Sequence, residues 1–222
     1  MHAFSRLLKT DLRNRRTALW MTLTTLVLLH GGFVSIPYFT ETPPYPLILN
    51  MNVILFVVAL SLPFLHAFNI WLEEWRHNTV FRLLSLPVHR TKLLLAKYAA
   101  IVIEVLLITG VMLLGLSVQN GLADGQLFRS EPLLTWGWST VAFVFSLLLL
   151  MSGLIFLIFF SVLLGRSAGR WPFLTTFLSF VAGLAISSFA FALVPSTVVL
   201  AVLGLAFFWG CFYWLEQKTG IA

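Results

Sequence analysis

Acidic and histidine side chains are the groups in this chain with the greatest capacity for chemistry. Glu73 and Glu74 form an adjacent acidic pair, and a carboxylate beside a histidine can act as a general base or hold a metal ion. His30, His66 and His89 fall at different expected depths and lack the helical spacing that would complete a metal site. The sequence therefore predicts no metal ligands and no catalytic residues.

The nearest enzymatic pattern is the E-E-x-x-x-R motif of prenyl-endopeptidase-like intramembrane metalloproteases. Arg76 stands two residues after the acidic pair, and Asn78 occupies the position of the motif's arginine. The required spacing fails, so an intramembrane protease is kept only as an alternative function. Substrate cleavage that is lost on Glu73→Gln or Glu74→Gln would support it.

The composition is that of a membrane protein. The 222 residues are 59% hydrophobic and 10% charged, whereas soluble domains carry about 25% charged residues. A helix needs about 20 apolar residues to cross the hydrocarbon core. The sequence predicts an all-α polytopic membrane protein with one six-span domain over residues 17–222. Its six expected spans cover residues 17–36, 51–72, 96–118, 136–164, 172–193 and 198–215.

The basic residues predict the orientation of the spans. Thirteen of the fourteen Lys and Arg residues fall before the first span, in alternate connecting segments, or after the last span, and Arg129 is the exception. Positive charge near a span tends to stay on the cytoplasmic side. Both termini are therefore expected to be cytoplasmic, and the formal net charge of +6 indicates topology rather than nucleic-acid binding.

Residues 1–16 form an amphipathic pattern. Phe4, Leu8 and Leu12 fall on one helical stripe, and Lys9 and Arg13 occupy the other side. Such a pattern predicts a helix that lies on the inner membrane surface. A basic tail that only sets the topology is the alternative.

Residues 73–90, "EEWRHNTVFRLLSLPVHR", concentrate charge and aromatic side chains between two apolar runs. The segment is longer than a simple connector, which needs two to eight residues. It is typical of an interfacial helix, and Pro87 prevents its simple continuation into the next span. We interpret it as a surface for a protein partner, with a lipid-facing elbow as the alternative.

The order of residues in this segment resembles the permease subunits of type-2 ATP-binding-cassette exporters. In that family an acidic pair or Glu follows span two, and then come a Thr, Leu-Leu-x-Leu-Pro-Val, a basic residue and a Leu-rich run ending in Lys. The corresponding residues here are Glu73 and Glu74, Thr79, Leu83 to Val88, Arg90, and Leu93 to Lys97. Asn78 departs from the family, which often has Gly there.

The resemblance implies that residues 73–90 are the coupling helix, which docks on a cytoplasmic ATPase subunit. By this resemblance the ATPase-coupling residues are Glu73, Glu74, Trp75, Arg76, Thr79, Phe81, Arg82, Leu86, Pro87 and Arg90. The chain has no G-x-x-x-x-G-K-[ST] loop to hold nucleotide phosphates. ATP and Mg²⁺ are thus expected in the partner, and no cofactor is expected in this chain.

Several polar residues inside the spans are candidates for a gate or a substrate pathway. Glu104 and His66 fall at a similar expected depth and could pair. In span five a small, weakly polar stripe recurs every four residues, for which helix packing is the favoured reading. In the resembled family, spans two and five face each other around the pathway. The pathway or gating candidates are Asn52, Ser61, His66, Asn69, Glu104, Thr175, Ser179 and Ser187.

The expected function is therefore that of an export permease that moves an amphipathic or hydrophobic molecule outward. The resemblance implies two permease subunits, alike or different, and two ATPases in a cell membrane, most simply a bacterial one. Small permeases of antimicrobial-peptide export or immunity are similar in length, and lipids and drugs remain open as substrates. A peptide sensor or immunity protein that is coupled to an ATPase and transports nothing is a further alternative.

Overall fold

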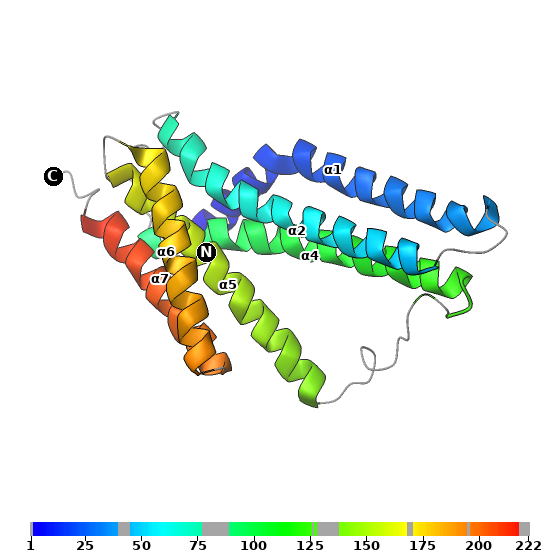
Figure 1. Ribbon diagram of the computed structural model, residues 1–222. Coiled ribbons are helices and arrows are strands. Elements are labelled where there is room, and N and C mark those ends of the chain that lie inside the picture. The colour runs from blue at the N-terminus through cyan, green and yellow to red at the C-terminus, as the bar shows by residue number, and fades with distance from the viewer. Residues whose placement is uncertain are drawn as a thin grey trace. The chain divides into compact units, whose positions relative to one another are not determined.

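Six long helices make up most of the chain that the structure describes. The computed structural model describes residues 2–39, 45–76, 89–125, 127, 138–167, 171–194 and 196–217. The helices are α1 (His2–Phe39), α2 (Tyr45–Arg76), α4 (Arg90–Leu122), α5 (Trp138–Ser167), α6 (Pro172–Leu193) and α7 (Thr197–Gln217) (Figure 1). All six are long and apolar enough to cross a membrane. The predicted all-α architecture with six spans is confirmed.

The helices extend beyond most of the predicted apolar runs. Only α6 has the predicted bounds. Helix α4 begins at Arg90, about a turn and a half before the run predicted for residues 96–118, and ends at Leu122, about one turn after that run. Hydropathy detects the part of a helix that lies in lipid, and a helix can continue into the interface with polar side chains. Residues 2–16 and the first span lie in one helix, α1, so the predicted division of this part of the chain into two elements stays a prediction.

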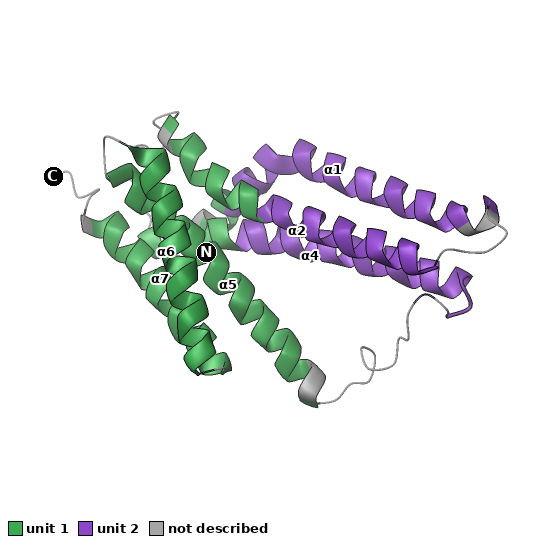
Figure 2. Ribbon diagram, in the orientation of Figure 1, with its two compact units in different colours: residues 1–7, 64–98, 137–222 green, residues 8–63, 99–136 purple. Residues whose placement is uncertain are grey.

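The chain divides into two compact units (Figure 2). Unit 1 contains residues 1–7, 64–98 and 137–222, and unit 2 contains residues 8–63 and 99–136. In α2 the division follows Pro63, which cannot donate the backbone hydrogen bond that the helix would otherwise form at this position.

Unit 2 is built from α1, the first half of α2 and most of α4. One apolar cluster joins Leu26 of α1, Ala59 of α2, and Ile108 and Met112 of α4. A second cluster, around Ile48 and Ala123, packs the ends of the same helices. The three helices of this unit therefore contact one another through two apolar clusters.

Unit 1 centres on α5, which packs against both α6 and α7. Gly153 of α5 faces Gly204 of α7, and a Cβ atom added to Gly204 would lie 3.6 Å from the Cα atom of Gly153. Small residues allow such close approach of helices in lipid. The Trp71 and Phe159 rings meet edge to face with centroids 6.0 Å apart, which joins the end of α2 to α5.

Candidate coupling site and buried polar contacts

The predicted coupling segment is described at its two ends. Glu73 and Arg76 are exposed at the end of α2, and Glu74 beside them and Arg90 at the start of α4 are half-buried. Trp75 lies in the last turn of α2. The other predicted coupling residues lie outside the described residues; they are Thr79, Phe81, Arg82, Leu86 and Pro87.

A buried ion pair connects the two helices at this site. The Lys97 ammonium of α4 binds the Glu74 carboxylate of α2, and the exposed fractions of these side chains are 1% and 15%. Lys97 Nζ also lies 5.1 Å from the ring centroid of Trp71, where a cation is attracted to the aromatic face. A charge pair in a low-dielectric site is costly to break because one partner would remain buried and uncompensated. The last turns of α2 are therefore tied to the third turn of α4.

A second contact ties the start of α4 to the end of α7. The Arg90 guanidinium donates a hydrogen bond to the backbone carbonyl of Leu215. This carbonyl is in the last turn of α7, where intrahelical partners are missing and a basic side chain is favourable. Both described ends of the coupling segment thus have polar contacts to helices of unit 1.

Glu104 has a basic partner on another helix. Its Oε2 atom lies 3.5 Å from Nη1 of Arg15 in α1, and the exposed fractions of the Glu104 and Arg15 side chains are 3% and 16%. The sequence analysis used Arg15 only as a topology signal, because the pairing depends on how α1 packs on α4. His66 belongs to the other unit, so the predicted pair of His66 and Glu104 stays a prediction.

Three buried polar side chains form a chain of hydrogen bonds in unit 2. Asn52 Nδ2 donates to Gln119 Oε1 at 2.7 Å and also to the carbonyl of Ile48 at 2.9 Å. With its oxygen used in this way, Gln119 presents Nε2 as a donor to His30 Nδ1, 2.7 Å away. This arrangement leaves the proton of neutral His30 on Nε2, which lies 3.3 Å from Met112 Sδ.

The backbone of α4 makes room for this histidine. A Cβ atom on Gly115 would lie 2.5 Å from the His30 ring, so only glycine fits at that position with the ring in place. The sequence analysis missed Gln119 because the predicted span ends at residue 118, whereas α4 continues to Leu122. The sequence signal for these hydrogen bonds was a set of polar side chains near the ends of apolar runs, where each buried polar group needs a hydrogen-bond partner.

The remaining pathway candidates are distributed over both units. Ser61 is exposed in unit 2, Asn69 is exposed in unit 1, and His66 is half-buried. The hydroxyls of Ser61 and Thr175 donate to carbonyls of their own helices, those of Val58 and Trp171. No common site for these residues is described within either unit, and their role stays a prediction.

The small-residue stripe of α6 takes part in helix packing. Thr175, Ser179 and Ser187 are half-buried, while Gly183 in the same stripe is buried. A Cβ atom on Gly183 would lie 2.2 Å from Cδ1 of Leu157 in α5. At Gly183 the stripe therefore allows close contact between α5 and α6, in agreement with the favoured packing interpretation.

Comparison with known proteins gives one match that covers almost the whole chain. Residues 6–217 match the family described as ABC-2 family transporter protein. No curated protein and no solved structure matches the chain. The matched range includes all six helices except the first residues of α1.

Proposed function

Because the chain belongs to the ABC-2 family of transporter proteins, we propose that it is a permease subunit coupled to a separate ATPase through residues 73–90. The family match over residues 6–217 carries the transport role, which makes the chain a multi-pass membrane transport subunit rather than an enzyme. ATP and Mg²⁺ are bound by the ATPase in this proposal. Two permease subunits and two ATPases form the complete exporter.

The contacts at the ends of the coupling segment support this role. Force applied to the segment reaches α2 and α4 together because Glu74 and Lys97 join them, and it reaches α7 through Arg90. A flexible linker would lose such force to local motion of its own backbone. Exposed Glu73 and Arg76 stand next to these buried contacts and are available to an ATPase surface.

The substrate of the proposed exporter is an amphipathic or hydrophobic molecule. An antimicrobial peptide, a lipid and a drug all satisfy this description, and the location is the cytoplasmic membrane of a bacterium. ATP-dependent accumulation of such a molecule in inverted vesicles would separate transport from peptide sensing without transport. Transport that is independent of ATP would contradict the coupling proposal.

Copurification tests the coupling surface directly. Glu74 is a poor target because its reversal would also break the pair with Lys97, whereas Glu73 and Arg76 are exposed. We expect the tagged chain, purified from its native membrane in mild detergent, to retain an ATPase. Glu73→Lys and Arg76→Glu should each reduce the retained ATPase by about tenfold, which is about 1.4 kcal/mol.

Lys92 provides the matched control for these charge reversals. It is exposed in the first turn of α4, outside residues 73–90, so Lys92→Glu should leave the retained ATPase unchanged. The thermal midpoints of all variants should agree within a few degrees because the altered side chains are exposed. Stable wild-type protein that brings down no ATPase would contradict the proposal.

A further inference from the structure

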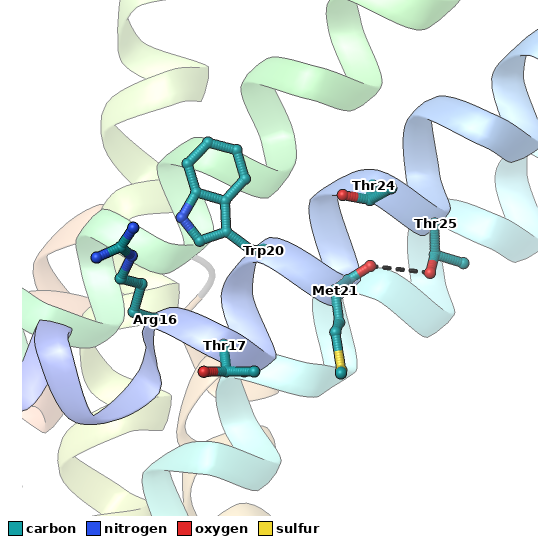
Figure 3. A pocket seen from close by; sticks show the side chains of 6 residues that line it. All are labelled: Arg16, Thr17, Trp20, Met21, Thr24 and Thr25. Atoms are coloured by element: carbon teal, nitrogen blue, oxygen red, sulfur yellow. Dashed lines mark hydrogen bonds between the residues drawn. The ribbon is translucent and has the colours of Figure 1, made fainter.

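The outward face of α1 carries an open groove with polar, aromatic and basic side chains. The groove has a volume of about 580 Å³, and all of its lining residues come from α1. Figure 3 shows the Arg16, Trp20 and Thr24 side chains rising from successive turns of the helix. The lining residues are Arg16, Thr17, Trp20, Met21, Thr24 and Thr25.

Two adjacent arginines at this position have opposite environments. Arg15 is turned toward α4 and pairs with Glu104, whereas Arg16 is exposed and lines the groove. Among the described residues, the Arg16 guanidinium has neither an ion pair nor a hydrogen bond. An arginine presents five N–H donors in a planar fork that matches the oxygens of phosphate.

Further basic residues continue the Arg16 side of the helix. Lys9 and Arg13 lie seven and three residues before Arg16, at helical spacing, and both are exposed. In the other direction the row of Arg16 continues with Trp20, which is exposed to 60%, and Met21 in the adjacent row of the groove is exposed to 67%. The face therefore changes from cationic to apolar within two turns, as a phospholipid does from headgroup to acyl chain.

From this arrangement we infer that the outward face of α1 is a binding site for an anionic phospholipid. The phosphate of the headgroup accepts hydrogen bonds from the Arg16 fork, while Lys9 and Arg13 add long-range attraction to the negative leaflet. The Trp20 indole lies at the headgroup level, the position that tryptophan prefers in membrane proteins. The acyl chains run along Met21, Thr24 and the apolar residues that follow.

The hydroxyl group of Thr25 in this groove is compatible with lipid as the occupant. Thr25 Oγ1 donates to the carbonyl of Met21 at 2.8 Å, within its own helix (Figure 3). A threonine that satisfies its hydroxyl in this way presents a methyl group outward and is compatible with acyl chains. A second protein chain on this face would instead have to provide oxygen acceptors for the N–H groups of Arg16.

Lipid binding to the full chain in detergent tests this site. Native mass spectrometry would compare short-chain phosphatidylglycerol with phosphatidylcholine of the same chain length, and inorganic phosphate would serve as competitor. We expect the wild type to prefer phosphatidylglycerol. Arg16→Gln should weaken phosphatidylglycerol binding by about fivefold, as loss of one basic contact with an anionic surface predicts. It should weaken phosphatidylcholine binding less, because the choline group offsets the charge of the shared phosphate.

Two further variants distinguish hydrogen bonding by the Arg16 guanidinium from the effect of its positive charge alone. Arg16→Lys keeps the charge and should retain part of the preference, whereas Lys92→Gln removes an exposed charge from α4 and should have no effect. Equal binding of both lipids by the wild type, or no effect of Arg16→Gln, would overturn the inference. Displacement of the lipid by inorganic phosphate at equal concentration would assign the site to free phosphate instead. A dimer that Arg16→Gln dissociates, with lipid binding unchanged, would assign the face to a second copy.

Discussion

Glu104 lies in an apolar helix, where an unpaired charge at the membrane centre costs about 2.5 to 3.5 kcal/mol. Its partner, Arg15, comes from α1, and the carboxylate and guanidinium are 3.5 Å apart. Lys97 is paired with Glu74 in the same way in the other unit. Both pairs join different helices, so each buried charge finds its counter-charge on a neighbouring helix.

Neutralising one member of the Arg15 and Glu104 pair should destabilise the protein more than neutralising both. Glu104→Gln removes the negative charge that faces the Arg15 guanidinium, and removal of one partner of a buried pair costs about 3 to 5 kcal/mol. We expect a lower midpoint of thermal unfolding in detergent. The double variant Arg15→Met/Glu104→Leu removes both charges and should recover much of the lost stability.

Glu216 offers the control for this comparison because it is an exposed acid near the end of α7. Glu216→Gln makes the same chemical change as Glu104→Gln and should alter the free energy of unfolding by about 0.5 kcal/mol or less. A double variant that is less stable than Glu104→Gln would show that the two charges are not energetically coupled. Arg15 would then matter through other contacts.

At the scale of helices, hydropathy predicted the six described apolar helices well and their ends poorly. The predicted span over residues 172–193 coincides with α6, because Trp171 and Pro172 mark its start and a short polar turn follows it. Helix α4 exceeds the predicted span because its polar ends remain helical, and this extension brings Gln119 to His30. Contacts between helices depend on rotation about each helix axis, which a hydropathy profile does not contain.

Gly165 illustrates a packing constraint that only the arrangement of two helices reveals. A Cβ atom there would lie 2.6 Å from the backbone carbonyl oxygen of Pro172 and 1.9 Å from Thr176 Oγ1. The backbone carbonyl cannot turn aside as a flexible side chain could, so α5 and α6 would have to separate. Gly165→Ala should therefore lower the free energy of unfolding by about 1 to 3 kcal/mol, the usual cost of overpacking.

Gly110 is the matched control because a Cβ atom at that position of α4 would meet no atom within 4 Å. Gly110→Ala should leave stability unchanged or raise it by up to about 1 kcal/mol, since alanine is the better helix former. Thermal unfolding of both variants in the same detergent would measure the difference. Equal midpoints for the two would mean that α5 and α6 can relax around an added methyl group.

At the scale of the whole chain, the coupling proposal depends on which side of the membrane holds residues 73–90. An ATPase acts only where ATP is present, so the coupling proposal requires this segment to be cytoplasmic. The distribution of Lys and Arg predicts that orientation, with thirteen of the fourteen on one side. The helices fix the order of the crossings, and the charge distribution predicts their direction.

Cysteine accessibility tests the orientation, because Cys211 is buried and is the only cysteine in the chain. In a Cys211→Ser background, Lys92→Cys places a thiol at an exposed site next to the coupling segment, and Asp124→Cys places one just after α4. In intact cells we expect a membrane-impermeant maleimide to label Cys at position 124 and to spare position 92. Opening the membrane should expose both thiols. The reverse pattern would place residues 73–90 outside, where a cytoplasmic ATPase could not bind them, and the coupling proposal would fail even though the family assignment would stand.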